Sequence, residues 1–400
     1  MSQRRVVVTG MGLVSPLGND LTTSWDGIVN GRSGIGPVTS FDASAFTTQI
    51  AGEIRNFDPA TFVSPKDAKK MDPFIHYGIA ASFMALDDSG LEITEANAER
   101  IGAIIGSGIG GIHGIEEQTI KLHEGGPRKV SPFYVPSTII NMLPGQLSIL
   151  KGLKGPSFSV VSACATSNHS IGVAMRSIQY GDADVMIAGG AELGSSPTSM
   201  AGFCSMKAMS TRNDAPTKAS RPWDKDRDGF VLGDGAGILV LEEYEHAKAR
   251  GARIYAELAG FGSSSDAHHM TAPSENGEGP ARCLTAALKD AGLNAEQVAY
   301  LQSVRGEIDT LEGTIFEFIE LFGSISADAN NDAALAGIQT IMGTWSSYPD
   351  TAATIVAPVN MHAKFLAMID RESQHAEDGH DGVEVVADHA DDGQQDDQQG

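Results

Sequence analysis

Short apolar runs alternate with longer amphipathic stretches along the first three-quarters of the chain. Apolar runs bounded by glycine or polar residues predict buried strands, whereas apolar residues at three- and four-residue steps predict helices. The predicted strands cover residues 4–9, 101–106, 157–163, 184–189, 230–242 and 253–263. The predicted helices cover residues 73–89, 165–180 and 279–291, the last closed by Gly292. This alternation indicates an α/β layered fold with largely parallel sheets.

The pattern changes after residue 302. Apolar residues between Ile308 and Phe322 recur at helical spacing, so we expect one amphipathic helix there. Residues 370–400 hold almost no large apolar side chain after Val386. Such a segment cannot bury enough surface to offset the entropy of ordering, and we expect an acidic, disordered tail. Its histidines alternate with carboxylates and could bind metal weakly, but a solvated tail is the preferred interpretation, and we predict no metal site.

Charge is concentrated in the same region. Residues 303–400 hold 19 Asp and Glu against 3 Lys and Arg, and so carry −16 of the formal net charge of −23. Net negative charge argues against nucleic acid as a partner. No run of 18 apolar residues predicts a membrane span, and the apolar run at the start is too short for a signal peptide. Three cysteines without paired spacing favour a reducing compartment, the cytoplasm.

Cys164 is the strongest candidate for chemistry. An apolar strand runs into a small-residue turn at this cysteine, and an amphipathic helix follows. A thiol at a helix N-terminus lies at the positive end of the helix dipole, which favours the nucleophilic thiolate. The neighbouring Ala163, Ala165 and Ser167 predict open space around the sulfur. A buried structural cysteine is the alternative, and the spacing alone does not separate the two.

Glycines after the first predicted strand suggest a dinucleotide-binding turn only weakly. The sequence GMGLVSPLG lacks the third glycine at the required spacing. No acidic residue stands out about 20 residues further on to bind a ribose. We therefore expect no nucleotide cofactor.

Four motifs in one order carry a family resemblance: RRVVVTGMGLVSPLG at the start, IGSGIGG at 105–111, VSACATSNHS at 161–170 and SRPWDKDRDGFVLGDGAG at 220–237. Together they closely resemble the β-ketoacyl-acyl-carrier-protein synthases of bacterial fatty acid synthesis, condensing enzymes of the thiolase superfamily, and in detail the type II synthase. The resemblance covers residues 1 to about 302. It implies the thiolase-like αβαβα fold, built of two similar halves.

The resemblance also implies a division of the chain. Residues 1–252 would form a complete N-terminal half that carries the nucleophile, and residues 253–302 would begin an incomplete C-terminal half. Residues 303–369 form a divergent segment of unknown fold, followed by the tail at 370–400. A frameshift, a fusion or an assembly error would each produce such a break.

By resemblance, Cys164 carries the growing acyl chain as a thioester, without cofactor or metal, and Ile109 and Phe203 line the acyl channel. For apolar residues, simple core packing is the alternative interpretation. Two histidines and a Gly-Phe-Gly-Gly turn of the family are missing here: Val304 stands where the first histidine would fall. His169, His268 and His269 are nearby in sequence or by family position, but we expect none to replace them. Condensation should therefore be severely impaired.

The family's partner is the strongly acidic acyl carrier protein, which a basic patch would attract. The family's docking positions correspond here to Lys66, Lys69, Lys70, Arg128, Lys129 and Lys207. A solvated surface cluster is the alternative interpretation. The family forms homodimers, and the segments 132–150 and 157–163 would lie at that interface.

Two hypotheses of different class remain. The first is a ketosynthase by descent, which condenses a Cys-bound acyl chain with malonyl-carrier protein and releases carbon dioxide. The second is a non-catalytic relic that binds carrier protein, or a frameshifted product that does not fold. The intact Cys164 argues mildly against a relic.

Overall fold

The computed structural model describes residues 4–222, 224–268, 274, 277–295, 298 and 353–357. The strands are β1 Val6–Val14, β2 Gly36–Pro37, β3 Ile50–Ala51, β4 Ile101–Gly106, β5 Ser157–Phe158, β6 Val185–Glu192, β7 Gly235–Glu243, β8 Ala256–Phe261 and β9 Ala353–Ala357. The helices are α1 Leu21–Val29, α2 Pro65–Ala68, α3 Pro73–Ser89, α4 Ile112–Gly125, α5 Tyr134–Thr138, α6 Met142–Lys151, α7 Thr166–Tyr180, α8 Pro197–Ser205, α9 Tyr244–Ala249 and α10 Glu278–Ala291.

The main sheet has the order β5-β4-β6-β7-β1-β8-β9. Strand β4 is parallel to β5 and β6, and β8 is parallel to β9, while β7 is antiparallel to both of its neighbours. The α/β class is confirmed, with mixed rather than largely parallel pairing. Antiparallel β7 arises because Glu192 at the end of β6 pairs with Gly235 at the start of β7. The long connection 193–234 therefore begins and ends at one edge of the sheet.

Most element boundaries agree with the sequence patterns. Strand 101–106 and helix 73–89 are confirmed to the residue. The predicted strand 157–163 is wrong beyond Phe158, because side chains replace the ladder there. Ser159 Oγ donates to the carbonyl of Ile105 at 2.6 Å, and the Ser162 N–H donates to Thr166 Oγ1 at 2.8 Å. The predicted strand 230–242 begins only at residue 235, at the start of β7.

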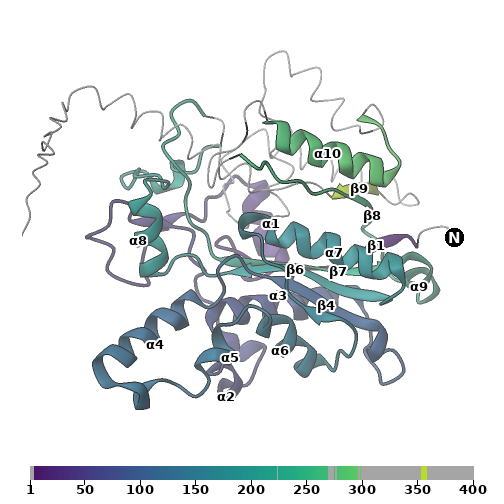
Figure 1. The fold of residues 1–400 in the computed structure, drawn as a ribbon, viewed down its shortest axis with the longest axis horizontal. Helices are drawn as coiled ribbons and strands as arrows, with labels where there is room; N and C mark the ends of the chain where they lie inside the picture. Colours follow the sequence, from purple (N-terminus) through teal and green to yellow (C-terminus); the bar gives the residue numbers. More distant parts are fainter. Residues whose placement is uncertain are drawn as a thin grey trace, which may run out of the picture.

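The layers are visible in Figure 1. Helices α3 and α6 cover one face of the sheet and α7 covers the other. Strand β8 pairs with β1 through Val7–Glu257 and Val8–Ala256, and its far end lies over α7, where Phe261 contacts His169 edge-to-face. Helix α10 lies beyond β8. The order αβαβα is therefore present, with β8 and β9 as the described part of the second β layer.

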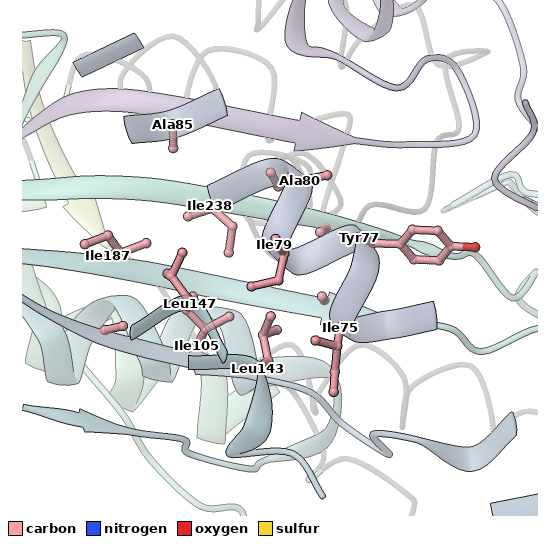
Figure 2. Close-up of a cluster of buried hydrophobic side chains, with 14 of the residues drawn as sticks. Ile75, Tyr77, Ile79, Ala80, Ala85, Ile105, Leu143, Leu147, Ile187 and Ile238 are labelled. Carbon is pink, nitrogen blue, oxygen red and sulfur yellow. The ribbon is translucent and has the colours of Figure 1, made fainter. Parts of the chain in front are cut away.

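Alternating side chains of the central strands build both cores. In β4, Ile105 faces α3 and α6, and Ile104 faces α7. Both faces of β4 are buried, because successive side chains point to opposite faces and helices cover each one. Figure 2 shows the first core, where Ile79 of α3 and Leu143 of α6 meet Ile187 of β6.

Two glycines in β1, Gly10 and Gly12, allow helix α3 to pack closely on the strand. A Cβ atom at Gly10 would lie 2.2 Å from the carbonyl oxygen of Ala85, and one at Gly12 would lie 1.9 Å from that of Ala81. Helix α3 therefore packs directly on the backbone of β1. This contact accounts for the GMG sequence without a nucleotide.

Helix α10 is fixed to the layer beneath it by a half-buried carboxylate, that of Asp290. Asp290 accepts a hydrogen bond from the N–H of Phe261 at 2.8 Å and pairs with Arg176 of α7 at 2.6 Å. One carboxylate thus joins β8, α7 and α10.

Several predictions fall on residues that the structure does not describe. The helix expected over 308–322 and the tail 370–400 lie outside the described residues. Of the segment 303–369, only the backbone of β9 is described. The boundary at residue 252 stays a prediction.

Candidate active site

Three chain segments meet at the carboxyl edge of the parallel strands. Strands β4 and β6 run side by side to Gly106 and Gly190. The glycine-rich residues 107–111 follow β4, Glu192 ends β6, and the turn with Cys164 follows β5. Ligand sites of α/β sheets form at this edge, because the carboxyl ends of parallel strands point the same way and loops leave from them.

Cys164 lies in a single 3-10 turn, Ala163–Ala165, directly before α7. Ala163 has φ of +49°, in the left-handed region that costs a non-glycine residue about 1–2 kcal/mol. Ser162, just before the turn, is hydrogen-bonded through Oγ to Nδ1 of His169 at 2.5 Å. The turn is thus strained at the residue before the sulfur and anchored on both sides, which presents the thiol in a fixed place.

The thiol is half-buried and packs with Ala165 and with Cys283 and Leu284 of α10. The predicted open space is therefore filled on the α10 side. Burial, together with a smaller effect of the Glu192 carboxylate, raises the pKa of Cys164 to about 11, against a hydrogen bond from the Cys164 N–H. The expectation that the helix end yields a thiolate is wrong for this geometry, because desolvation outweighs the effect of the helix end.

Glu192 was not singled out by the sequence patterns. Its Oε2 accepts from the N–H groups of Gly108 at 2.6 Å and Ile109 at 3.1 Å. Its Oε1 accepts from Ser107 Oγ at 2.8 Å and from the Gly110 N–H at 3.3 Å. Burial raises the pKa of Glu192, and these four donors act against the rise. The sequence signal that could have identified Glu192 is its position directly after the apolar run VMIAGGA.

The two predicted channel residues lie in different surroundings. Ile109 is at the tip of the loop held by Glu192, with 40% of its surface exposed. Phe203 on α8 packs edge-to-face on Phe230 at 5.3 Å, in a cluster with Met200 and Leu232. The structure thus brings Ile109 to the edge that carries Cys164. Phe203 is part of an apolar cluster, which both a channel lining and simple core packing would require.

A second buried carboxylate organises the neighbouring connection. Asp234 accepts from the N–H groups of Gly194 and Ser195 at 2.9 and 3.0 Å, and from Ser195 Oγ at 2.6 Å. Burial raises the pKa of Asp234 to about 6, against these hydrogen bonds. The start of the 193–234 connection is thereby fixed beside β7.

The predicted basic residues lie on short helices and turns at the surface. Lys70 pairs with Asp67 at 2.6 Å and lies 5.9 Å from the ring centroid of Phe133. The other five are exposed, on α2 and its C-cap, on the turn after α4 and after the end of α8: Lys66, Lys69, Arg128, Lys129 and Lys207. The contact with Phe133 brings the 66–70 segment to the region before α5. The structure gives no contact that joins all six into one patch.

The structure describes His169 and His268 of the three histidines considered near the site. His169 packs on Phe261 and bonds Ser162, and burial lowers its pKa. His268 is exposed, and His269 lies outside the described residues. Among the residues that the structure describes, no group of three His, Cys, Asp or Glu side chains could hold a metal ion. The same residues contain no helix long and apolar enough to cross a membrane.

This arrangement agrees with comparisons to known proteins. The family described as "Beta-ketoacyl synthase, N-terminal domain" matches residues 3–247, and its C-terminal domain matches residues 255–304. The chain belongs to the beta-ketoacyl synthase family. By family it is therefore an acyltransferase of the ketosynthase type.

Curated members of the beta-ketoacyl synthase family are similar over the same region. The chain is 61% identical over 303 residues to 3-oxoacyl-[acyl-carrier-protein] synthase 2 of Vibrio cholerae, which covers 76% of this chain and 73% of that protein. It is 53% identical over 303 residues to the protein of that name from Coxiella burnetii, with the same two coverages.

Solved ketosynthase structures share the fold. A beta-ketoacyl synthase from Burkholderia phymatum is 35% identical, with a TM-score of 0.66 over 73% of this chain and 72% of that one. A type II polyketide ketosynthase, solved with its acyl-carrier protein and bound to a hexaketide, is 28% identical, with a TM-score of 0.67 over 93% and 86% of the two chains. The thiolase-like fold expected from the motifs is confirmed.

Proposed function

We propose that this chain is a 3-oxoacyl-[acyl-carrier-protein] synthase by descent that accepts acyl groups on Cys164 but condenses them poorly. The observation that carries the proposal is the placement of Cys164 on a strained turn beside the loop of Ile109. The similarity to 3-oxoacyl-[acyl-carrier-protein] synthase 2 of Vibrio cholerae supports the substrate class. The missing family histidines, with Val304 in place of the first, are the reason for poor condensation.

Acyl acceptance needs only groups in the part of the chain that matches the family. The Cys164 sulfur attacks the thioester carbonyl of acyl-carrier protein, the carrier's C–S bond breaks, and the carrier thiol leaves with the proton that Cys164 gave up. Condensation then requires donors that stabilise the enolate formed when malonyl thioester loses carbon dioxide. His169 cannot serve, because its ring is engaged with Ser162 and Phe261.

Acyl carrier protein is the proposed partner. The structure of a related ketosynthase with its acyl-carrier protein supports this choice. The exposed cations Lys66, Lys69, Arg128, Lys129 and Lys207 would attract an acidic carrier. The three free cysteines support a reducing compartment, and we infer the cytoplasm.

A homodimer is the proposed assembly. Strand β5 is an edge strand of the main sheet, and large apolar side chains beside it are exposed. Phe158 is 41% exposed, Val161 56% and Ile149 73%, and an apolar sheet edge of this kind favours association. Sedimentation should give a dimer for the native chain and a monomer for Phe158→Lys; a native monomer would contradict the assembly.

The acylation experiment uses intact-mass measurement after incubation with acyl-carrier protein. We expect one acyl adduct on the native chain and on the matched control Cys204→Ala, and none on Cys164→Ala. Malonyl-carrier protein added to the acylated chain should yield little 3-oxoacyl product. Folded native protein without an adduct, or an adduct that survives Cys164→Ala, would reject the proposal.

The alternative is a carrier-binding relic without acyl transfer. The observation that favours it is the raised pKa of Cys164, about 11, which leaves little thiolate near neutral pH. Carrier binding without any adduct in the same experiment would support the relic.

A further inference from the structure

Glu192 holds the Ser107–Gly110 loop, which contains Ile109 and which we call the acyl loop, yet the proposed chemistry gives this carboxylate no role. A Cβ atom at Gly108 would lie 2.8 Å from Glu192 Oε2 and 3.5 Å from the Cα of Ala163. At Gly108 the loop is therefore close to both Glu192 and the turn before Cys164. A side chain at this position would displace the Glu192 carboxylate.

The loop's polar groups converge on this one side chain. Three successive N–H groups, of Gly108, Ile109 and Gly110, donate to the Glu192 carboxylate, and Ser107 Oγ donates as well. Successive backbone N–H groups that point at one anion fix the conformation of a short loop, because each bond removes a backbone freedom. Ile109, whose side chain is 40% exposed, is held in place through its own N–H.

We propose that Glu192 is a positioning residue of the acyl site: it holds the Ser107–Gly110 loop against the Cys164 turn and so fixes Ile109 where it limits the acyl chains that reach the thiol. This role rests on the proposed acylation of Cys164. Glu192 does not touch the reacting atoms, and it acts through the loop. Loosening the loop lets Ile109 swing away, which favours long acyl chains over short ones.

Glu192→Gln is the direct test, because it keeps the shape of the side chain. An amide NH2 replaces one accepting oxygen. In the Oε2 position it leaves the N–H groups of Gly108 and Ile109 without this acceptor, and in the Oε1 position it leaves Gly110 with Ser107 Oγ, at 3.0 Å, as its acceptor. The matched control is Glu53→Gln. Glu53 is a buried glutamate that likewise holds a loop, through the N–H and Oγ1 of Thr39 and the N–H of Ser40, whereas Glu192 is partly buried.

Two measurements are made on each full-length variant. Amide hydrogen exchange of the peptide that spans residues 107–111 should become about 10-fold faster in Glu192→Gln, since a buried hydrogen bond to a charged acceptor is lost. The ratio of long-chain to short-chain adduct formation on Cys164, with C16 and C6 acyl thioesters, should rise about threefold or more, as expected when one apolar contact is relaxed. Glu53→Gln should change neither.

The outcomes separate the two proposals. If adducts form with native length ratios and native exchange in Glu192→Gln, the positioning role is rejected and acylation stands. If no chain is acylated, the proposed function fails, and the exchange rate alone decides whether Glu192 holds the loop. If Glu53→Gln changed the exchange rate and the chain-length ratio as much as Glu192→Gln does, a general loss of stability would explain both variants, and the proposal would be overturned.

Discussion

At the scale of single residues, Cys164 shows how two local effects compete. The N-terminus of α7 favours a negative charge on the sulfur, by about 0.3–1 kcal/mol for an ordinary helix end. Burial of the thiol against Cys283 and Leu284 acts in the other direction and raises its pKa to about 11. The charged side chain that adds to the shift is Glu192, an anion. The thiol is therefore protonated at neutral pH.

The reactivity of Cys164 should follow this pKa. Only the thiolate reacts, so with a pKa of about 11 the fraction available at pH 7 is on the order of one in 10,000. We expect the iodoacetamide rate at Cys164 to rise about tenfold per pH unit from pH 7 to about pH 10. Peptide mapping by mass spectrometry separates Cys164 from the other cysteines. A rate that levels off by pH 8.5 would show that the folded thiol has an ordinary pKa.

At the scale of elements, Asp184 joins the amino ends of three strands. Its carboxylate pairs with Arg4 at the start of β1 at 2.5 Å, and with Arg100 ahead of β4 at 2.9 Å. The hydrogen bonds from Arg100, together with those from Arg4, lower the pKa of Asp184 to about 2 against burial. Strands far apart in sequence are thereby registered at one corner of the sheet.

Asp184→Asn should lower the free energy of unfolding at pH 7. A pKa lowered from 3.8 to about 2 corresponds to somewhat over 2 kcal/mol, and partial exposure of the pair reduces this to about 1 kcal/mol. Because the folded pKa is the lower one, the stabilisation is complete above pH 3.8 and disappears as the pH falls through about 2. Urea unfolding of the native chain and of Asp184→Asn at pH 7 and at pH 2.5 measures the loss of unfolding free energy and its decrease at low pH.

The exposed neighbour Asp182 provides the control. Asp182→Asn should leave the free energy of unfolding within about 0.5 kcal/mol of the native value, as for most surface substitutions. An equal loss in both variants, or a loss at Asp184 that persists unchanged to pH 2.5, would show that the ion pair is not the cause.

At the scale of the whole molecule, the family match stops where the composition changes. The C-terminal family domain matches only residues 255–304, and the segment after it carries −16 of the chain's −23 charge. The described structure holds β8 and α10 within this match, and β9 outside it. Cys164, the proposed nucleophile, and the Ser107–Gly110 loop thus lie in the matched part, whereas our proposal places the groups needed for decarboxylation in the family's ending that residues 303–400 do not match.

Two changes to the chain test this division. Deleting residues 370–400 should leave the circular dichroism spectrum and the Cys164 adduct unchanged, because that tail lacks apolar residues to pack. Replacing residues 303–400 with the family's own ending should raise the condensation rate by about 100-fold or more, since loss of one oxyanion donor alone costs that much. Equal condensation rates before and after the replacement would show that residues 303–400 already supply the missing groups.

Many of the strands and helices could be predicted from local sequence patterns. The apolar runs of β4 and β6 and the periodicity of α3 depend on neighbours within a few residues, so the sequence indicates them directly. The predicted strand 157–163 ends early because the Ser159 side chain bonds to the β4 backbone and the Ser162 N–H bonds to the Thr166 side chain instead of a neighbouring strand.

The sequence by itself determined the turn before a helix at Cys164, the α/β class and the position of the break near residue 302. Only the tertiary structure decided the mixed pairing of the sheet, the raised pKa of the thiol and the hold of Glu192 on the loop of Ile109. The sulfur is covered by α10, more than 100 residues further along the chain, and the Glu192–Gly108 bond spans 84 residues. Burial and hydrogen bonding between such distant residues arise only when the layers pack, which is why chemistry at this site could be located from the sequence but not characterised.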